Sequence, residues 1–438
     1  MKSKTLFLLN RTPFVRDFNA KIRSLTSQRR LVLGIESSCD DTCCSVISVN
    51  SNCEPSILSD CRQCDSRKHT EFGGILPQVV SFMHSNSIES VVRNAFNVSG
   101  IDIHSIDAIG VSNRPGLLPS LRIGTEYAKR LSLKYNKPLI PVHHMEAHAL
   151  TAGLNYPQLK FPFLSLLISG GHCQILLVTS VDNFLLLGEA KTKVSPGETL
   201  DKIARVLKVK NLGPPFDRVT GGRALELLAK FGNPNAYFSD FKLFNPKLPK
   251  SCNFHFSGIR TLVESKIKQL EEKSSLPVDC PIHEIADIAA SVLSLFTRYI
   301  WHRIRNAIYF LESSNILKSK DRVIQSNSTF VKDYTIERQP VKLQLAISGG
   351  VACNKYITET LKELCENANF SYADTEIEVI VPEPKLCTDN AVMIAWNAYL
   401  KLLNDSNDVL VNKEQIEAVD IDPKAPFANN ISDLIEKI

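Results

Sequence analysis

Short apolar segments of strand length alternate with longer amphipathic segments along most of the chain. The first half contains a strand-turn-strand pattern over 31–47 and apolar runs at 106–111 and 138–142. Segments 85–99 and 120–136 have the three-to-four-residue apolar period of helices. This alternation of strands with helices predicts a layered fold of the α/β class.

A second series of predicted strands begins near Phe163, and helical patterns dominate residues 198–312. The polar, charged segment 319–342 has no clear period, and we expect it to be a surface insertion. Strand and helix patterns then resume up to about residue 400. The expected divisions are an N-terminal segment 1–30, a first lobe 31–155, a second lobe 156–400, and a C-terminal helix and tail 401–438.

The composition is that of an ordinary globular protein. Its 438 residues, 44% of them apolar, are enough for two or three domains with a sizeable buried core. No apolar run approaches the roughly 18 residues that a membrane-spanning helix needs. We therefore expect a soluble protein without membrane insertion.

The first 30 residues differ from the rest in charge. They contain eight Lys or Arg and a single acid, so they carry +7, and the remainder of a chain with a total of +5 carries −2. A basic, acid-poor N-terminus is typical of an organelle transit peptide. The alternative is a basic tail that binds nucleic acid, but apolar residues between Phe7 and Phe18 favour the transit peptide.

Residues 191–268 form a second basic region, with 15 Lys or Arg against 6 acids. Such a region can bind a polyanion. Ordinary solvated helix faces have similar compositions. The sequence leaves both interpretations open.

The 12 cysteines are scattered without regular spacing, and no secretory signal precedes them. This usage indicates reduced, mostly buried thiols rather than a disulfide scaffold. Cys61 and Cys64 form a Cys-x2-Cys pair that could bind zinc, although a turn of a β-hairpin is the simpler interpretation.

Two histidines, His144 and His148, follow the apolar run 138–142 and are four residues apart. On a helix they would share one face and could bind a divalent cation together with a third ligand from elsewhere. An isolated pair of this kind is more often structural. A zinc protease helix needs a glutamate directly after the first histidine, whereas Glu146 points away from the histidine face.

Two predicted strands end in the same Ser-Gly-Gly sequence, at 169–171 and at 348–350. Because glycine has no Cβ atom, backbone N–H groups in such turns can approach a ligand closely, and the pair of turns suggests a nucleotide cradle. The polar turn 37–41 could contact a phosphate or its metal, but it is also compatible with a plain polar hairpin.

Nine motifs, taken together and in order, make the chain similar to the universal tRNA threonylcarbamoyladenosine transferase family. The resemblance extends from about Leu31 to Trp396, and the N-terminal segment makes the chain resemble the mitochondrial branch. The motifs are Gly34-Ile-Glu-Ser-Ser-Cys-Asp-Asp-Thr42, Gly73-Gly74 with Pro77 and His84, Arg114-Pro-Gly-Leu117, His143-His-Met-Glu-Ala-His148, Ile168-Ser-Gly-Gly-His172, Asp201-Lys202, Phe256-Ser-Gly258, Gly349-Gly-Val-Ala-Cys-Asn354 and Cys387-Thr-Asp-Asn390.

The resemblance implies a two-lobed fold of the actin-like ATPase and sugar kinase type. It implies transfer of the threonylcarbamoyl group of threonylcarbamoyl-adenylate to the N6 amine of adenosine 37, in tRNAs that read codons beginning with A, with release of AMP. A separate synthase would supply the adenylate. A homodimer in the mitochondrial matrix is expected.

By the same resemblance, His144, His148 and Asp389 coordinate one divalent cation, zinc or iron. The adenylate-binding positions map to Leu167, Ile168, Ser169, Gly170, Gly171, Asp201, Gly222 and Asn354. No side chain is an obvious nucleophile, so direct transfer is expected. Asp40 or Asp41 is a candidate for assisting deprotonation of the amine, and a structural role beside the phosphate is the alternative for both. Because both histidines must be neutral to bind metal, activity is expected to fall at acid pH.

The chain departs from the family at Arg114 and Pro119, where glycine is usual, and at Gln78 and Phe82, where glutamate and arginine are usual. These departures affect the expected tRNA-facing side more than the expected metal site. Two other functions remain open, an ATP-dependent small-molecule kinase of the same fold and a non-catalytic scaffold. The intact set of three metal ligands argues against the scaffold.

Overall fold

The computed structural model describes residues 29–64, 77–191, 194–237, 250–274, 282–314, 341–368 and 375–436. The expected transit peptide 1–30 and the expected insertion 319–342 lie almost entirely outside these residues, as do Gly73 and Gly74. None of the described helices is both long enough and apolar enough to cross a membrane.

The first lobe is built on a five-stranded sheet with the order β3-β2-β1-β4-β5. Strand β1 pairs antiparallel with β2 and β2 with β3, whereas β4 is parallel to β1 and β5 is parallel to β4. Helices α4 and α5 pack on the sheet and on each other. The bounds are β1 (Arg30–Glu36), β2 (Thr42–Val49), β3 (Pro55–Gln63), β4 (Ala108–Arg114), β5 (Leu139–His143), α4 (Pro77–Ser99) and α5 (Leu118–Tyr135).

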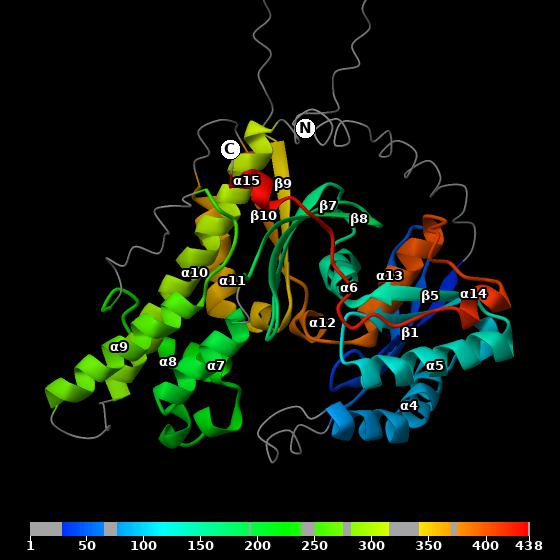
Figure 1. Ribbon diagram of the computed structural model, residues 1–438, viewed down its shortest axis with the longest axis horizontal. Helices are drawn as coiled ribbons and strands as arrows, with labels where there is room; N and C mark the ends of the chain where they lie inside the picture. The colour runs from blue at the N-terminus through cyan, green and yellow to red at the C-terminus, as the bar shows by residue number, and fades with distance from the viewer. Residues whose placement is uncertain are drawn as a thin grey trace, which may run out of the picture.

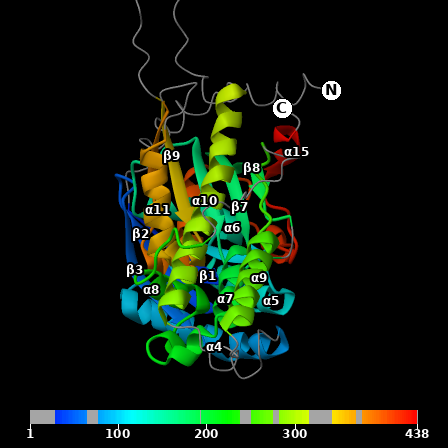
Figure 2. The ribbon, with the colours of Figure 1, turned by 90° about the vertical axis from the view of Figure 1, so that its left-hand side faces the viewer.

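The second lobe contains a six-stranded sheet with the order β10-β9-β6-β7-β8-β11. Figure 2 shows helices α8 to α11 in front of this sheet. The strands are β6 (Phe163–Ile168), β7 (Cys173–Ser180), β8 (Asn183–Glu189), β9 (Val341–Ser348), β10 (Thr375–Ile380) and β11 (Asn429–Asn430). The helices are α7 (Pro196–Val206), α8 (Gly221–Ala229), α9 (Ser257–Ser274), α10 (Ile282–Ser313) and α11 (Lys355–Glu366).

The two sheets repeat one topology. In the second sheet β6 and β8 are antiparallel to β7, whereas β9 is parallel to β6 and β10 is parallel to β9. The order β8-β7-β6-β9-β10 therefore repeats β3-β2-β1-β4-β5, with β11 added at the edge. This duplication is the arrangement expected of the actin-like ATPase and sugar kinase fold, and it confirms the predicted two-lobed α/β class.

Helix α13 (Ala391–Leu403) follows the second sheet in the chain but packs on the first sheet, against β1, β2, β4 and β5. Two glycines permit this contact. A Cβ atom at Gly34 would lie 2.2 Å from the carbonyl oxygen of Ala391, and one at Gly110 would lie 2.6 Å from Cβ of Ala398. The sheet and helix thus approach more closely than larger residues would allow.

Helices α6 (His144–Leu150) and α12 (Pro384–Cys387) lie between the two sheets in Figure 1. The 3-10 helix η6 (Gly350–Cys353) packs against α12. Two other short helices lie away from this region, α14 (Lys413–Glu417) against α5 and α15 (Ser432–Ile435) against β8. Elements of both lobes therefore meet where the predicted site residues lie.

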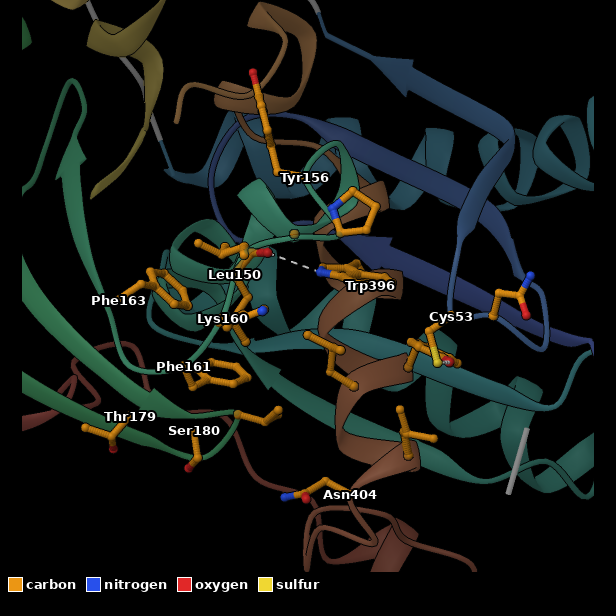
Figure 3. Close-up of a pocket in the computed structure, with 18 residues that line it drawn as sticks. Cys53, Leu150, Tyr156, Lys160, Phe161, Phe163, Thr179, Ser180, Trp396 and Asn404 are labelled. Atoms are coloured by element: carbon orange, nitrogen blue, oxygen red, sulfur yellow. Dashed lines mark hydrogen bonds between the residues drawn. The ribbon is translucent and has the colours of Figure 1, made fainter. Parts of the chain in front are cut away.

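A pocket of about 390 Å³ lies between the lobes and is shown in Figure 3. Its wall includes the aromatic residues Tyr156, Phe161, Phe163 and Trp396, and Trp396 Nε1 donates a hydrogen bond to the carbonyl oxygen of Leu150 at 3.1 Å. None of the residues predicted to bind metal or adenylate lines this pocket. It is a feature separate from the site described next.

Candidate metal and nucleotide site

The two histidines predicted to share a helix face do so at the start of α6. This short helix follows β5 directly, and the imidazole of His143 caps its first turn by accepting a hydrogen bond from Met145 N. The rings of His144 and His148 lie edge to face with their centroids 4.7 Å apart. Both residues are buried, with 9% and 5% of their surface exposed.

Asp389 completes a group of three potential ligands. Its Oδ1 atom lies 3.1 Å from Nε2 of His148 and 3.6 Å from Nε2 of His144. Asp389 is 241 residues beyond His148 in the chain, and it immediately precedes Asn390, whose side chain caps α13 by accepting from Met393 N. The potential ligand atoms all lie within 4.8 Å of one another.

Glu36 and Ser38 fix the orientation of His144. Nδ1 of His144 lies 3.1 Å from both Glu36 Oε2 and Ser38 Oγ, and the backbone N–H of Ser38 donates to Glu36 Oε1 at 2.5 Å. The Glu36 carboxylate, at the end of β1, is 1% exposed. A proton on Nδ1 directed to this carboxylate leaves the Nε2 lone pair facing Asp389. The sequence analysis did not assign this role to Glu36.

The charges in this cluster are strongly coupled. Burial disfavours protonation of His144, but the carboxylates of Glu36 and Asp389 outweigh it and raise the pKa of His144 to about 9. Burial likewise favours the neutral forms of both acids, yet His144 lowers the pKa of Glu36 and, together with His148, that of Asp389. Without a cation, His144 is therefore protonated at neutral pH.

The donor set fits a divalent cation. Two imidazole nitrogens and one carboxylate oxygen are the ligands of many catalytic zinc and iron sites, which keep a further position for substrate. Metal-binding histidines usually donate a hydrogen bond from their other ring nitrogen to a carboxylate, and Glu36 is placed to accept this bond from His144. The assignment of these three residues as metal ligands nevertheless stays a prediction.

Glu146 is directed away from the histidines, as the helical spacing predicted. Its Oε2 lies 3.1 Å from Nζ of Lys401, a side chain that is only 2% exposed. Lys401 also pairs with Asp408 and lies 3.9 Å from Asp182 Oδ1. Glu146 is thus part of an ion-pair network that joins α6, α13 and the β7–β8 turn, and it takes no part in the metal cluster.

The first Ser-Gly-Gly turn follows β6 and is open to ligands. A Cβ atom at Gly170 or Gly171 would meet nothing within 4 Å. Ser169 Oγ stabilises the turn by accepting hydrogen bonds from the N–H groups of Gly171 and His172. Leu167 and Ile168 are buried strand residues, with 1% and 0% exposed, so of the predicted segment only Ser169 to Gly171 presents open surface.

The second Ser-Gly-Gly turn is closed at Gly349 and open at Gly350, where a Cβ atom would meet nothing within 4 Å. Gly349 has φ of +96°, and a Cβ atom there would lie 2.3 Å from the carbonyl oxygen of Ile168. Ser348 Oγ donates to the carbonyl oxygen of His148 at 2.8 Å. The two turns therefore pack together beside α6 through Ser348 and Gly349, whereas Gly170, Gly171 and Gly350 face open space.

The remaining three predicted adenylate positions come together although they are far apart in sequence. Asp201 Oδ1 accepts a hydrogen bond from Gly222 N at 3.1 Å, and Asn354 Nδ2 donates to the carbonyl oxygen of Gly222 at 3.4 Å. Asn354 also caps α11 by accepting from Ile357 N at 3.2 Å. Beneath them the buried Glu226 accepts from Lys355 N at 3.1 Å.

The turn and the metal cluster are neighbours. Gly349 packs against the carbonyl oxygen of Ile168, at the start of the first turn, and the neighbouring Ser348 Oγ donates to the carbonyl oxygen of His148, so the first turn lies beside the histidine helix.

The comparison with known families identifies the same family as the sequence motifs. The model of the family described as tRNA N6-adenosine threonylcarbamoyltransferase (TsaD) matches residues 56–396. The chain belongs to this family. It is accordingly an acyltransferase, and the family depends on a metal.

Relatives in this threonylcarbamoyltransferase family match over nearly the whole chain. The Xenopus tropicalis protein is 35% identical over 99% of this chain and 97% of its own length. The Homo sapiens protein is 36% identical over 96% of this chain and 91% of its own length. Both are named as the mitochondrial tRNA N6-adenosine threonylcarbamoyltransferase, which supports a mitochondrial location for this chain. A bacterial relative from Pelagibacter ubique is 34% identical over 84% of this chain.

The acids proposed to assist deprotonation have partners of their own. Asp41 Oδ2 forms an ion pair with Arg62 at 2.6 Å, and Asp40, Asp41 and Cys64 form a second group of close potential ligands. Burial raises the pKa of Asp41, against the effects of Cys64 and Arg62. The ion pair favours the structural alternative for Asp41, and a part in deprotonation stays a prediction for both acids.

The four departures from the threonylcarbamoyltransferase pattern lie on α5, at the end of β4 and on α4. Pro119 lies in the first turn of α5, where proline is well tolerated. Arg114 Nη2 lies 4.0 Å from Asp408 Oδ2, at the edge of the Lys401 network. Gln78 and Phe82 lie on exposed positions of α4, and Phe82 is 68% exposed.

Proposed function

We propose that this chain transfers the threonylcarbamoyl group of threonylcarbamoyl-adenylate to the N6 amine of adenosine 37 in tRNAs that read codons beginning with A, and releases AMP. The observation that carries the proposal is the convergence of His144, His148 and Asp389 beside an open Ser-Gly-Gly turn. Family membership supports the reaction type and tRNA as the acceptor.

The nucleotide would be held by groups from the second lobe. The Cβ positions of Gly170 and Gly171 face open space, so a phosphate or carbonyl group can approach the backbone of this turn closely. Asp201, Gly222 and Asn354 form the hydrogen-bonded wall on which the nucleoside would rest.

His144, His148 and Asp389 would hold one divalent cation, zinc or iron. When bound, this cation supplies positive charge that offsets the negative charge on the phosphate of the departing AMP. Glu36 keeps the His144 ring in the orientation that this role requires, because its carboxylate accepts a hydrogen bond from Nδ1–H.

The transfer would proceed in one step. The N6 nitrogen of adenosine attacks the carbamoyl carbon, a C–N bond forms, and the bond from this carbon to the phosphate oxygen breaks. The amine loses one proton, and AMP leaves as the anion. This direct transfer uses no covalent intermediate on the protein, and Asp40 or Asp41 is the candidate acceptor for the proton.

The partners follow from the reaction. A separate synthase would supply the adenylate, and the protein would act as a homodimer in the mitochondrial matrix. Exposed basic residues of the region 191–268, such as Lys208 and Arg218, lie on the lobe that carries the nucleotide wall and are candidates for contact with the tRNA backbone.

The test is transfer of labelled threonylcarbamate from threonylcarbamoyl-adenylate to an unmodified tRNA bearing adenosine 37. A His144→Ala, His148→Ala double variant should lose the activity, whereas the control His104→Ala, at an exposed position, should keep it. Equal transfer by the parent protein and the double variant would contradict the metal assignment.

Two other results would favour the alternative functions. ATP turnover with a small-molecule acceptor and indifference to tRNA would indicate the kinase. Nucleotide binding by the parent protein without any transfer would indicate the scaffold.

A further inference from the structure

The pocket between the lobes is walled by two pairs of aromatic rings. Phe161 and Phe163, at the start of β6, have ring centroids 5.5 Å apart, and so do Trp396 and Tyr399 on α13. Figure 3 shows Trp396 across the pocket from Phe161 and Phe163. A mainly apolar pocket of about 390 Å³ between two lobes has the size and setting of a small-molecule site.

The polar atoms of these rings are already used inside the protein. Trp396 Nε1 donates to the carbonyl oxygen of Leu150 at 3.1 Å, and the Tyr399 hydroxyl donates to Cys53 Sγ at 3.5 Å. The hydroxyl of Tyr156, also in the wall, donates to a carbonyl oxygen of the segment after β10 at 3.2 Å. The rings therefore offer an occupant apolar faces, which favour an apolar body.

Lys160 supplies charge at this pocket. Among the described residues that line it, Lys160 is the one cation and none is an acid. The ion pairs of the described residues do not include Lys160, and in Figure 3 its amine points toward the side of the pocket that carries Trp396. Asp182, next in the chain to a wall residue, is held by Asn404 and Ser406. The electrostatic field at the pocket therefore favours an anion.

We propose that this pocket binds a small organic acid with an apolar body, the acid group at Lys160 and the body between the two aromatic pairs. Burial of the body removes apolar surface from water and favours binding. The acid group meets Lys160 at an exposed position, so no charge has to be buried. A neutral molecule gains nothing from Lys160, and a cation is repelled by it.

The pocket wall continues both elements that carry the predicted metal ligands. Leu150 ends α6, and Gly153 belongs to the 3-10 helix η2 (Thr151–Leu154) that follows it. Trp396 lies seven residues after Asp389, and a Cβ atom at Gly153 would lie 3.3 Å from Trp396 Nε1. An occupant would thus contact both elements and should stabilise the folded protein. This binding does not depend on the proposed transfer reaction.

Two fluorescent probes of similar shape test the proposal on the purified full chain. Anilinonaphthalene sulfonate carries an acid group on an apolar body, and phenylnaphthylamine has the same body without the acid group. The sulfonate should bind at one saturable site per chain and raise the free energy of unfolding. Absence of saturable binding would overturn the proposal. Binding that weakens as the protein concentration rises would overturn it as well, because a second copy of the chain would then cover the pocket.

Substitutions in the wall test the charge and locate the probes. Lys160→Met should weaken binding of the sulfonate by about two- to fivefold, the effect of an exposed ion pair, and leave binding of phenylnaphthylamine unchanged. The control Lys134→Met, at an exposed position of α5 outside the pocket, should change neither. Ser180→Trp adds a large ring at the wall and should abolish saturable binding of both probes, with urea unfolding as the check that the variant is folded.

Two results with these variants would count against the site. Equal effects of Lys160→Met on the two probes would show that the acid group does not meet this lysine. Undiminished binding of both probes by folded Ser180→Trp would place them outside the pocket.

Discussion

Nδ1 of His144 lies 3.1 Å from Oε2 of Glu36, a buried carboxylate at the end of the first strand. This contact decides which nitrogen of His144 is available to a cation, because a proton shared with Glu36 leaves Nε2 free. The first strand of the protein thus contributes to the candidate metal site without supplying a ligand.

Replacement of Glu36 by Gln should weaken metal binding by about 10- to 100-fold, the usual effect of losing the carboxylate behind a ligating histidine. Fold stability should change much less, because the shape of the side chain is kept. Metal affinity is measured by competition with a chromophoric chelator. Glu54→Gln, at an exposed position, is the control, and unchanged affinity in Glu36→Gln would contradict the assigned role.

Metal should stabilise the folded protein only when the three ligands are intact. At a metal concentration about 100 times the dissociation constant, the free energy of unfolding should rise by about 2.7 kcal/mol. Asp389→Asn should remove most of this increment, because the oxygen that faces both histidines loses its charge. Chemical denaturation with and without a chelator measures the difference, and an equal increment in parent and variant would place the metal elsewhere.

Metal binding should release about one proton at neutral pH. In the metal-free protein the pKa of His144 is raised from 6.5 to about 9, so the ring is protonated below that pH and must lose its proton to bind. Apparent metal affinity should therefore rise by up to about tenfold per pH unit between pH 7 and 9, and level off above. Calorimetric titration in buffers with different heats of ionisation counts the protons, and a count of zero at pH 7.5 would refute this expectation.

Gly349 and Gly170, one from each Ser-Gly-Gly turn, should respond differently to replacement by alanine. Gly349→Ala should lower the free energy of unfolding by at least about 2 kcal/mol, because the positive φ and the contact with Ile168 leave no room for a Cβ atom. Gly170→Ala, in open space, should leave stability within about 0.5 kcal/mol but weaken nucleotide binding. Denaturation and nucleotide titration are measured on both variants, and equal stability of the two would contradict the distinction.

Replacement of Lys401 by Met should destabilise the fold by about 3 kcal/mol, because it leaves the largely buried Glu146 without its counter-charge. The partial exposure of Asp408 and Asp182 keeps the expected loss at the lower end of the range for buried pairs. Lys413→Met, which removes an exposed pair with Glu417, should cost less than about 0.5 kcal/mol. Urea unfolding of both variants makes the comparison, and similar midpoints would show that the network adds nothing.

The fold was predictable from the sequence to a large extent, because strands and helices here have strong and regular apolar periods. Segment 120–136 corresponds to α5, which spans Leu118–Tyr135, and the run 138–142 corresponds to β5. The periodicity carries no information about the partner of a helix, however. That α13 crosses back to the first sheet depends on the fit of Ala391 and Ala398 to Gly34 and Gly110, which appears only in three dimensions.

The site was predictable in part. Local spacing identified His144 and His148 as one face and excluded Glu146, and the structure agrees with both. Asp389 came from family resemblance alone, since no local pattern links residues 241 positions apart. Glu36 was missed because an acid at the end of a strand looks the same whether it orients a ligand or faces solvent.

The passage of α13 back to the first sheet also has a consequence for the order of folding. The last strand of the first sheet ends some 240 residues before α13, the helix that covers one face of this sheet. During synthesis or transport across a membrane, all strands of the first sheet are therefore present long before α13. Until residue 403 arrives, Gly34 and Gly110 lie at a bare surface, and the two histidines await the aspartate that precedes α13. A product that stops short of this helix is therefore left with an uncovered apolar sheet, the feature by which quality-control proteases distinguish unfinished chains.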